Sequence, residues 1–374
     1  MKILHVNNSA QGGGTETYID RIIQSLEKEG HTNSLYIQKF TSGNHPIKAL
    51  LNTRHNLQKL RGLIDVFNPD IIHVHNINNY RLLKFLLSQR PCLKSVHEFR
   101  PFCTTLRVRP DTGAICNERM SLKCFKTGCF KLSPGSIYRY MVDKKAARVI
   151  GGFPGIWVMS RFMAGMVKSV LPNATNLEVV PYFYDPPPTE PPILEETPRI
   201  FTAGRLVQGK GFDVLMDILA KLNIPFELRI AGEGPERERL EKLAHEKNIP
   251  AHFLGFVAPE QLIDHYNWSR VVVFPSTYPE PFGIVGLEAM GAARPVVAFD
   301  VGGVSDWLLD GQVGYCIPAY DTTLFAEKIK LLLEDYPSAK QMGDTGRQRV
   351  MTEFSSERHV LRLMKTYGRL AGKS

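Results

Sequence analysis

Two glutamates stand eight positions apart in the stretch Glu280-Pro-Phe-Gly-Ile-Val-Gly-Leu-Glu288. Prolines flank Glu280 on both sides, which favours an extended loop there. Gly283 then precedes a helical pattern, and the unpaired N–H groups of a helix's first turn attract anions. Glu288 lies one turn after Ile284, on the same helix face. The stretch suits a nucleotide-sugar, because the helix start would take the diphosphate and the carboxylates would take hydroxyls of the sugar and the ribose.

The N–H groups predicted to be unpaired are those of Ile284, Val285 and Gly286. A second loop, which directly follows the strand predicted at 199–203, would face the same ligand. In Gly204-Arg-Leu-Val-Gln-Gly-Lys-Gly211, Arg205 offers a planar fork of donors and Lys210 a point charge, so the two could clamp a diphosphate.

Three histidines, His73, His75 and His97, fall at the ends of predicted strands in the first half of the chain. Ligands of open α/β sheets bind at the carboxyl ends of the strands. A single histidine at such a position is more often packed or capped than catalytic. His97 is the best catalytic candidate, and His75 and Asn76 are candidates for lining an acceptor pocket.

Four of the six cysteines, Cys103, Cys116, Cys124 and Cys129, gather among basic residues in the segment 98–135. Structural disulfides are disfavoured in a cytoplasmic protein, whereas four thiolates suit a tetrahedral structural zinc site. Free or redox-active thiols remain the alternative, because the spacing lacks a close pair of the C-x2-C kind.

Alternating strand and helix patterns run through both halves of the chain and predict doubly wound parallel sheets. The proline-rich stretch 186–192 is a stiff linker that divides them. We therefore predict domains at 1–185, including an insertion at 98–135, and at 186–354, with a last helix of about 355–374 returning to the first. Gly12, Gly13 and Gly14 do not match G-x-G-x-x-G, which argues against a dinucleotide site.

The stretch from Glu280 to Glu288 resembles the E-x7-E motif of retaining glycosyltransferases of family 4, which have the GT-B fold. The string G-R-L-x3-K-G at Gly204–Gly211 is also similar to that family. The resemblance implies two Rossmann-like domains facing a cleft, with the last helix crossing back to the first. It implies catalytic roles for His97, Glu280, Arg205 and Lys210. It implies donor contacts from Gly13, Gly14, Arg205, Lys210, Glu233, Phe256, Gly283, Ile284, Val285 and Glu288.

The implied reaction moves a hexose or N-acetylhexosamine, with retention, from a nucleotide diphosphate-sugar to a hydroxyl of a glycan, glycolipid or small molecule. A UDP-sugar is the first expectation and GDP-mannose the second, in the biosynthesis of cell-surface polysaccharide. No Asp-x-Asp occurs in the chain, so we expect transfer without a metal and no cofactor beyond the structural zinc. A nucleotide-sugar 2-epimerase of the same architecture and a non-catalytic nucleotide-sugar binder are the alternatives.

The net charge of +9 is unevenly distributed, since residues 1–185 carry 25 Lys and Arg but only 12 Asp and Glu. This asymmetry fits an anionic membrane surface or a phosphate-bearing, lipid-linked acceptor as well as it fits an ordinary solvated surface. No nucleic-acid-binding motif accompanies it. The first residues read as a strand and not a signal peptide, and no apolar run reaches the roughly 20 residues of a membrane span. We therefore expect a cytoplasmic protein, peripheral on the inner face of the membrane.

Overall fold

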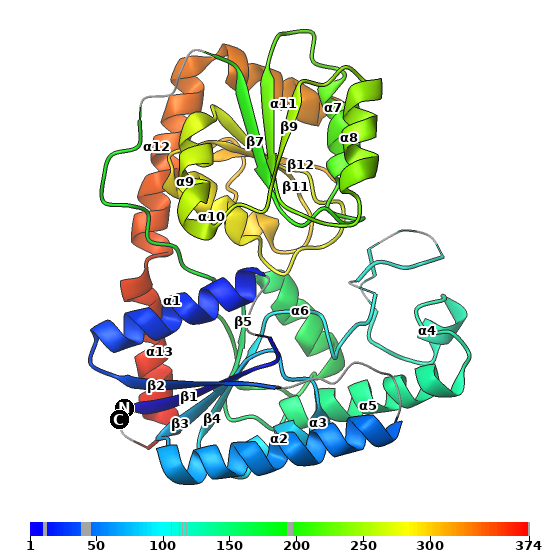
Figure 1. Ribbon diagram of the computed structural model, residues 1–374, viewed down its shortest axis with the longest axis vertical. Helices are drawn as coiled ribbons and strands as arrows, with labels where there is room; N and C mark the ends of the chain where they lie inside the picture. Colours follow the sequence, from blue (N-terminus) through cyan, green and yellow to red (C-terminus); the bar gives the residue numbers. More distant parts are fainter. Residues whose placement is uncertain are drawn as a thin grey trace. The chain divides into compact units, whose positions relative to one another are not determined.

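The computed structural model describes residues 1–9, 13–38, 46–105, 107–111, 113, 115–116, 118–192 and 197–372. The chain forms two compact units (Figure 1). Residues 1–181 together with 356–374 form the first unit, and residues 182–355 form the second. Gly12 and the predicted end of the second strand at Phe40 lie outside the described residues.

The described part of the first unit contains a six-stranded parallel sheet in the order β2-β1-β3-β4-β5-β6. Its strands are β1 (Lys2–Asn7), β2 (Thr32–Ile37), β3 (Ile71–Val74), β4 (Cys92–Val96), β5 (Ile156–Val158) and β6 (Leu177–Val179). Every residue of β3, β4 and β5 is buried, whereas the edge strands β2 and β6 are partly exposed. Helices on both faces bury such a sheet, which explains the runs of apolar residues in its inner strands.

The helices of the first unit are α1 (Gly14–Lys28), α2 (Pro46–Phe67), α3 (Tyr80–Leu87), α4 (Lys123–Lys126), α5 (Pro134–Ile150), α6 (Arg161–Val170) and α13 (Ser356–Leu370). Side-chain caps fix several of their starts. The carbonyl of the Asn79 side chain accepts from the N–H groups of Arg81 and Leu82, and the Ser160 hydroxyl accepts from Met163 N. α5 begins at Pro134, because Ser133 caps it and proline suits the first helical position.

The end of the chain consists of two separate helices. α12 (Tyr336–Glu353) belongs to the second unit and α13 to the first. Between them Phe354 is buried and leaves the helical conformation, with φ −120° and ψ 25°. α13 then packs beside α1 (Figure 1). The Tyr367 hydroxyl lies 2.7 Å from His73 Nδ1, which ties α13 to the sheet.

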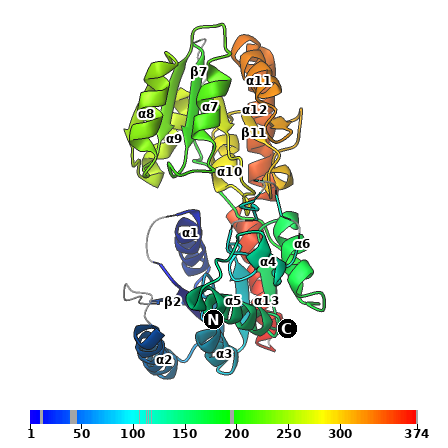
Figure 2. The same cartoon turned by 90° about the vertical axis from the view of Figure 1, so that its right-hand side faces the viewer.

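The second unit contains a sheet in the order β12-β11-β10-β7-β8-β9 among its described residues. Figure 2 shows this sheet with helices on either side. Its strands are β7 (Arg199–Ala203), β8 (Glu227–Ala231), β9 (Ala251–Gly255), β10 (Val271–Phe274), β11 (Val296–Phe299) and β12 (Gly314–Ile317). Its helices are α7 (Phe212–Leu219), α8 (Arg237–Glu246), α9 (Pro259–Trp268), α10 (Ile284–Gly291), a 3₁₀ turn at Val304–Asp306, α11 (Thr322–Glu334) and α12. β10 and β11 are wholly buried runs of β-branched, alanine and phenylalanine side chains. The edge strand β12 was not predicted.

The insertion at 98–135 has little regular structure in its described part. Val108 and Ile115 form one antiparallel bridge, and α4 is a single turn. Met120, Phe130 and Tyr140 form a small core of their own, with Cys124 and Cys129 packed against it. None of the helices in the described part of the chain combines the length and apolarity that a bilayer crossing requires.

Candidate active site

The centre of the second unit's site is an ion pair between Lys210 and Glu280. Lys210 lies in the loop between β7 and α7, and its Nζ is 2.8 Å from Glu280 Oε1. The Ser276 hydroxyl donates to the same oxygen at 2.5 Å. Burial alone would lower the pKa of Lys210, but the Glu280 carboxylate overcomes this and leaves the pKa raised. Lys210 is therefore a cation held at a fixed place, and Glu280 Oε2 accepts no hydrogen bond from the described residues.

Two aromatic rings and Arg205 complete the surroundings of this pair. Lys210 Nζ lies 5.2 Å from the ring centre of Tyr278 and 5.8 Å from that of Phe274. Burial, followed by the charge of Glu280, raises the pKa of Tyr278, while Lys210 and Arg205 act in the opposite direction. Arg205 is exposed and forms no ion pair with a carboxylate among the described residues. The loop between β7 and α7 thus supplies both positive charges of the site.

Sequence reasoning missed Ser276 and Tyr278. Both stand within four residues of Glu280 in the same Pro-Ser-Thr-Tyr loop after β10, so their position in the chain was an available signal. The missing information was geometric, because a hydroxyl and a ring in a loop are common and only the fold turns them toward the carboxylate.

The start of α10 differs in one detail from the prediction. Gly283 precedes the helix with φ 96°, in the left-handed region that favours glycine. Gly286 N–H donates to Gly283 O at 3.0 Å, so this donor is not open to a ligand. A Cβ on Gly286 would lie 2.3 Å from the Trp307 ring, so glycine is required there by packing. Ile284 and Val285 N–H have no acceptor among the described residues and remain available for an anion.

Glu288 lies one turn further along α10 and is buried. The Tyr266 hydroxyl of α9 donates to Glu288 Oε2 at 3.1 Å. Glu233 and Phe256 follow the ends of β8 and β9, which are neighbours in the sheet. A Cβ added to Gly255 would lie 2.8 Å from Glu233 Oε1, and the adjacent Phe256 is 77% exposed. Glu233 also pairs with Arg237 at 2.7 Å.

In the first unit, Gly13 caps α1 and Gly14 is its first residue. Gly13 is extended, with φ −173°, so its backbone conformation does not by itself require glycine. Asn7, at the end of β1, links this region to the next strand, because its side-chain oxygen accepts from Asn76 N at 3.2 Å. A polar contact thereby joins the ends of β1 and β3.

The histidines form a buried hydrogen-bonded line across the sheet. His5 Nδ1 lies 3.1 Å from His75 Nε2, and His75 Nδ1 lies 3.0 Å from His97 Nε2. His97 is 3% exposed, and the Tyr18 ring packs edge-on against it. Burial lowers the pKa of His75 and His97 well below the usual value and that of His5 to about 4, so all three rings are neutral near pH 7.

The four cysteines of the insertion are free and partly exposed. The Thr105 hydroxyl lies 3.7 Å from Cys103 Sγ and 3.6 Å from Cys129 Sγ, so these two sulfurs flank one group. Among the described residues, His5, His73 and His75 are the one set that brings three metal-type ligand atoms within 4.8 Å of one another.

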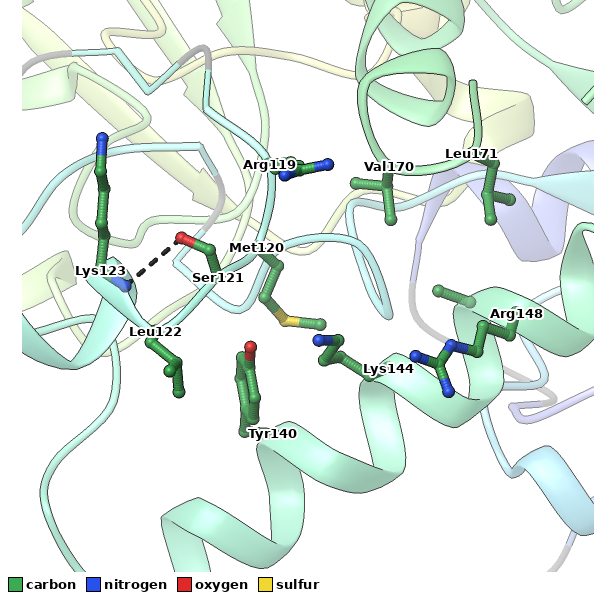
Figure 3. A pocket seen from close by; sticks show the side chains of 11 residues that line it. Arg119, Met120, Ser121, Leu122, Lys123, Tyr140, Lys144, Arg148, Val170 and Leu171 are labelled. Atoms are coloured by element: carbon green, nitrogen blue, oxygen red, sulfur yellow. Dashed lines mark hydrogen bonds between the residues drawn. The ribbon is translucent and has the colours of Figure 1, made fainter. Parts of the chain in front are cut away.

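A basic pocket of about 560 Å³ opens between the insertion, α5 and the end of α6. Figure 3 shows Tyr140, Lys144 and Arg148 projecting from α5 toward Arg119 and Met120. Its charged and apolar lining consists of Arg119, Lys123, Lys144 and Arg148 with Met120, Leu122, Tyr140, Val170 and Leu171. Lys123 pairs with Glu118 at 3.3 Å, whereas no described carboxylate pairs with Lys144 or Arg148.

Comparison with known proteins agrees with this geometry. Residues 188–349 match the family described as glycosyl transferases group 1. The chain is 33% identical over 156 residues to an alpha-D-kanosaminyltransferase of Streptomyces kanamyceticus, covering 40% of each chain. It is 32% identical over 172 residues to a GDP-mannose-dependent alpha-(1-6)-phosphatidylinositol monomannoside mannosyltransferase of Mycobacterium tuberculosis, covering 43% of this chain and 45% of that one. These alignments span less than half of the relatives' own length.

Solved structures match over nearly the whole chain. Sucrose-phosphate synthase of Thermosynechococcus elongatus superimposes with a TM-score of 0.78 at 20% identity, covering 100% of both chains. The Anabaena protein HepE, solved with UDP, gives a TM-score of 0.71 at 18% identity over 99% of this chain and 100% of that one. The second unit thus matches the group 1 glycosyl transferases in sequence, and the whole chain has the GT-B fold of glycosyltransferases.

Proposed function

We propose that this protein is a retaining glycosyltransferase that needs no metal for transfer. It moves a hexose or N-acetylhexosamine from a nucleotide diphosphate-sugar to a hydroxyl of a glycan or glycolipid acceptor. The observation that carries the proposal is the ion pair of half-buried Lys210 with buried Glu280, in the unit whose α10 leaves the N–H groups of Ile284 and Val285 open. UDP is the first choice of nucleotide, since HepE was solved with UDP, and GDP is the second, since one curated relative is GDP-mannose-dependent.

The chemistry follows from where charge develops. As the bond from the sugar to the diphosphate breaks, negative charge grows on the phosphate oxygens, and Lys210, Arg205 and the first N–H groups of α10 stabilise it. Glu280 Oε2 accepts from a hydroxyl of the sugar, which orients the ring. The acceptor hydroxyl then attacks on the face that the diphosphate leaves, and its proton passes to the departing phosphate oxygen. His97 remains the candidate of the first unit for a catalytic role.

The test is nucleotide release from a panel of UDP-, GDP- and ADP-sugars, each with and without EDTA and with and without glycan acceptors. We expect one nucleotide class to turn over with an acceptor at a rate that EDTA does not change. An epimerase would convert the donor alone into a second sugar nucleotide, and a non-catalytic binder would be stabilised by donor yet release no nucleotide. Turnover that requires a divalent metal would contradict the proposed mechanism.

We also propose that Cys103, Cys116, Cys124 and Cys129 hold a structural zinc ion. The described part of the insertion has one turn of helix, one bridge and a three-residue core, so it has little else to stabilise it. EDTA alone should then lower the melting temperature and release about one zinc per chain, and Cys129→Ser should bind less zinc while Cys316→Ser binds the normal amount. A metal-free protein with a melting temperature insensitive to EDTA would exclude the ion.

The basic pocket and α5 support a lipid-linked acceptor at an anionic membrane surface. Leu122, Tyr138 and Met141 are 72%, 57% and 51% exposed beside the cations of the pocket. Apolar side chains next to Lys and Arg suit the boundary of a bilayer, where each basic residue contributes about 1 kcal/mol. The phosphate of the acceptor would lie among Arg119, Lys144 and Arg148.

This surface predicts sedimentation with vesicles that contain phosphatidylglycerol and not with pure phosphatidylcholine vesicles. Lys144→Glu combined with Arg148→Glu should weaken vesicle binding at least about tenfold, from roughly 1 kcal/mol per basic residue. The control carries Lys28→Glu and Lys242→Glu, which change the net charge equally at exposed positions outside the pocket. An equal loss of vesicle binding in both double variants would mean that net charge alone causes the effect. That result would contradict a binding site at the pocket.

A further inference from the structure

The site loop between β10 and α10 is held in place by the segment that follows β11. Gly302 and Glu280 form an isolated parallel bridge, and Gly303 N–H donates to Glu280 O at 2.8 Å. Further along the same two stretches, Trp307 Nε1 donates to Phe282 O at 2.6 Å. This segment therefore fixes the direction of two backbone carbonyls in the site loop.

The hydrogen bond from Trp307 sets the orientation of a whole peptide plane. A trans peptide is planar, and its C=O and N–H point in opposite directions. The peptide that joins Phe282 to Gly283 is trans, and its C=O points at the indole of Trp307, which is 0% exposed. Its N–H therefore points away from this buried ring. Gly283 itself is half-buried, and its N–H has no acceptor among the described residues.

The Gly283 N–H stands next to the two donors that α10 leaves open. Gly283 has φ 96° and ψ 71°, in the left-handed region, and Ile284 begins the right-handed helix. Consecutive residues of opposite hand turn their N–H groups toward one concavity, which binds anions. Since Gly286 N–H is taken up by Gly283 O, the donors of this concavity are the N–H groups of Gly283, Ile284 and Val285.

The indole is itself held by three neighbouring elements. From α12, Arg349 donates through Nη1 to Trp307 O and through Nη2 to Asp306 O, the latter at 3.3 Å. At the end of β10, the Phe274 ring packs edge-on against the indole, with the ring centres 6.2 Å apart. On α10, the indole lies so close to Gly286 that an added Cβ would be 2.3 Å from Trp307 Cη2. Trp307 is thus fixed in the orientation that directs its N–H at the site loop.

We propose that Trp307 is a positioning residue of the donor site, which acts by aiming the Gly283 N–H at a phosphate oxygen of the nucleotide. The indole lies behind the loop and acts only through the Phe282–Gly283 peptide. This inference deepens the proposed function and rests on it, because the phosphate belongs to the nucleotide donor. The competing explanation is a tryptophan that only fills the core of the second unit. The two explanations differ in whether the indole N–H contributes to nucleotide affinity beyond its effect on stability.

A pair of variants separates the N–H group from the volume of the ring. Trp307→Phe removes both, so it should lower the melting temperature and the affinity for UDP or GDP. Gly286→Ala then restores volume, because its methyl group would occupy the place of Trp307 Cη2, Cζ3 and Cζ2, in the part of the indole that phenylalanine lacks. The double variant should therefore regain most of the lost melting temperature. Its nucleotide affinity should stay about tenfold below that of the wild type, the usual effect of one hydrogen bond to a charged group.

Trp157→Phe is the matched control. Trp157 is 0% exposed in the first unit, and its indole N–H has no hydrogen-bond partner among the described residues. This change should lower the melting temperature and leave nucleotide affinity at the wild-type value. Thermal melting and calorimetric titration of UDP and GDP in excess EDTA, on the full-length wild type and the three variant proteins, measure both quantities.

The proposal is overturned if nucleotide affinity in Trp307→Phe equals that of the wild type, or if it returns together with the melting temperature in the double variant. An equal loss of affinity in Trp157→Phe would also overturn it, because stability alone would then govern binding. The wild type reports on the proposed function by itself. If the wild type binds neither UDP nor GDP, that function fails and this inference fails with it, whereas normal binding by both the wild type and the double variant refutes only the role of Trp307.

Discussion

Replacing Lys210 with alanine should reduce kcat/KM for transfer by about 10²–10³-fold, the usual loss when one donor to the developing negative charge is removed. The same change leaves Glu280, which is 4% exposed, without its cation. Breaking a buried ion pair in this way typically costs about 3–5 kcal/mol of stability. Steady-state kinetics and chemical denaturation measure the two effects separately.

A double variant separates chemistry from folding. Lys210→Met with Glu280→Gln removes both charges, so most of the stability should return, whereas transfer should remain lost because the phosphate has no cation. The control is Lys221→Ala, an exposed lysine of the same unit that bonds to the Thr322 hydroxyl, and it should behave as wild type. Recovery of activity in the double variant would show that Lys210 acts only through stability.

Gly302→Ala should be the most damaging small substitution near the site. Gly302 has φ 66°, and a Cβ there would lie 2.2 Å from Glu280 O and 2.4 Å from Glu280 N. Because the strain of a left-handed alanine adds to this clash, we expect a loss of about 2–5 kcal/mol in the free energy of unfolding. Because the backbone of Glu280 must move, donor affinity should fall as well.

Gly311→Ala is the matched control, since Gly311 has φ 71° but nothing lies within 4 Å of its added Cβ. It should lose only the conformational part, about 1–2 kcal/mol, and keep donor affinity. Denaturant titrations of both variants and donor titrations by fluorescence would measure the difference. Equal losses in the two variants would mean that the close approach to Glu280 does not matter.

The sequence predicted the doubly wound parallel sheets, because parallel strands buried on both faces need continuous apolar runs such as Val271–Phe274. It did not reveal β12, whose Gly-Tyr-Cys-Ile run is short and partly exposed at a sheet edge.

Site residues that are close together in the sequence could be predicted from it. Contacts between residues that are far apart in the sequence, which the sheet brings together, were harder to predict. Glu280, Gly283 and Ile284 are neighbours in the chain, so their spacing already suggested an anion site. The pairing of Lys210 with Glu280 joins residues 70 positions apart. The hydrogen-bonded line from His5 through His75 to His97 depends on strand order and ring orientation, neither of which the spacing in the sequence encodes.

The central claim is that a nucleoside diphosphate binds the second unit through the protein's own cations and amides. Calorimetric titration of UDP and GDP into the wild type in excess EDTA, repeated with Lys210→Ala, tests it most directly. We predict saturable binding of one nucleotide in EDTA and a loss of at least about tenfold in the variant, as expected for one charged hydrogen bond. Absence of binding until Mg²⁺ is added, or equal affinity in the variant, would contradict the account.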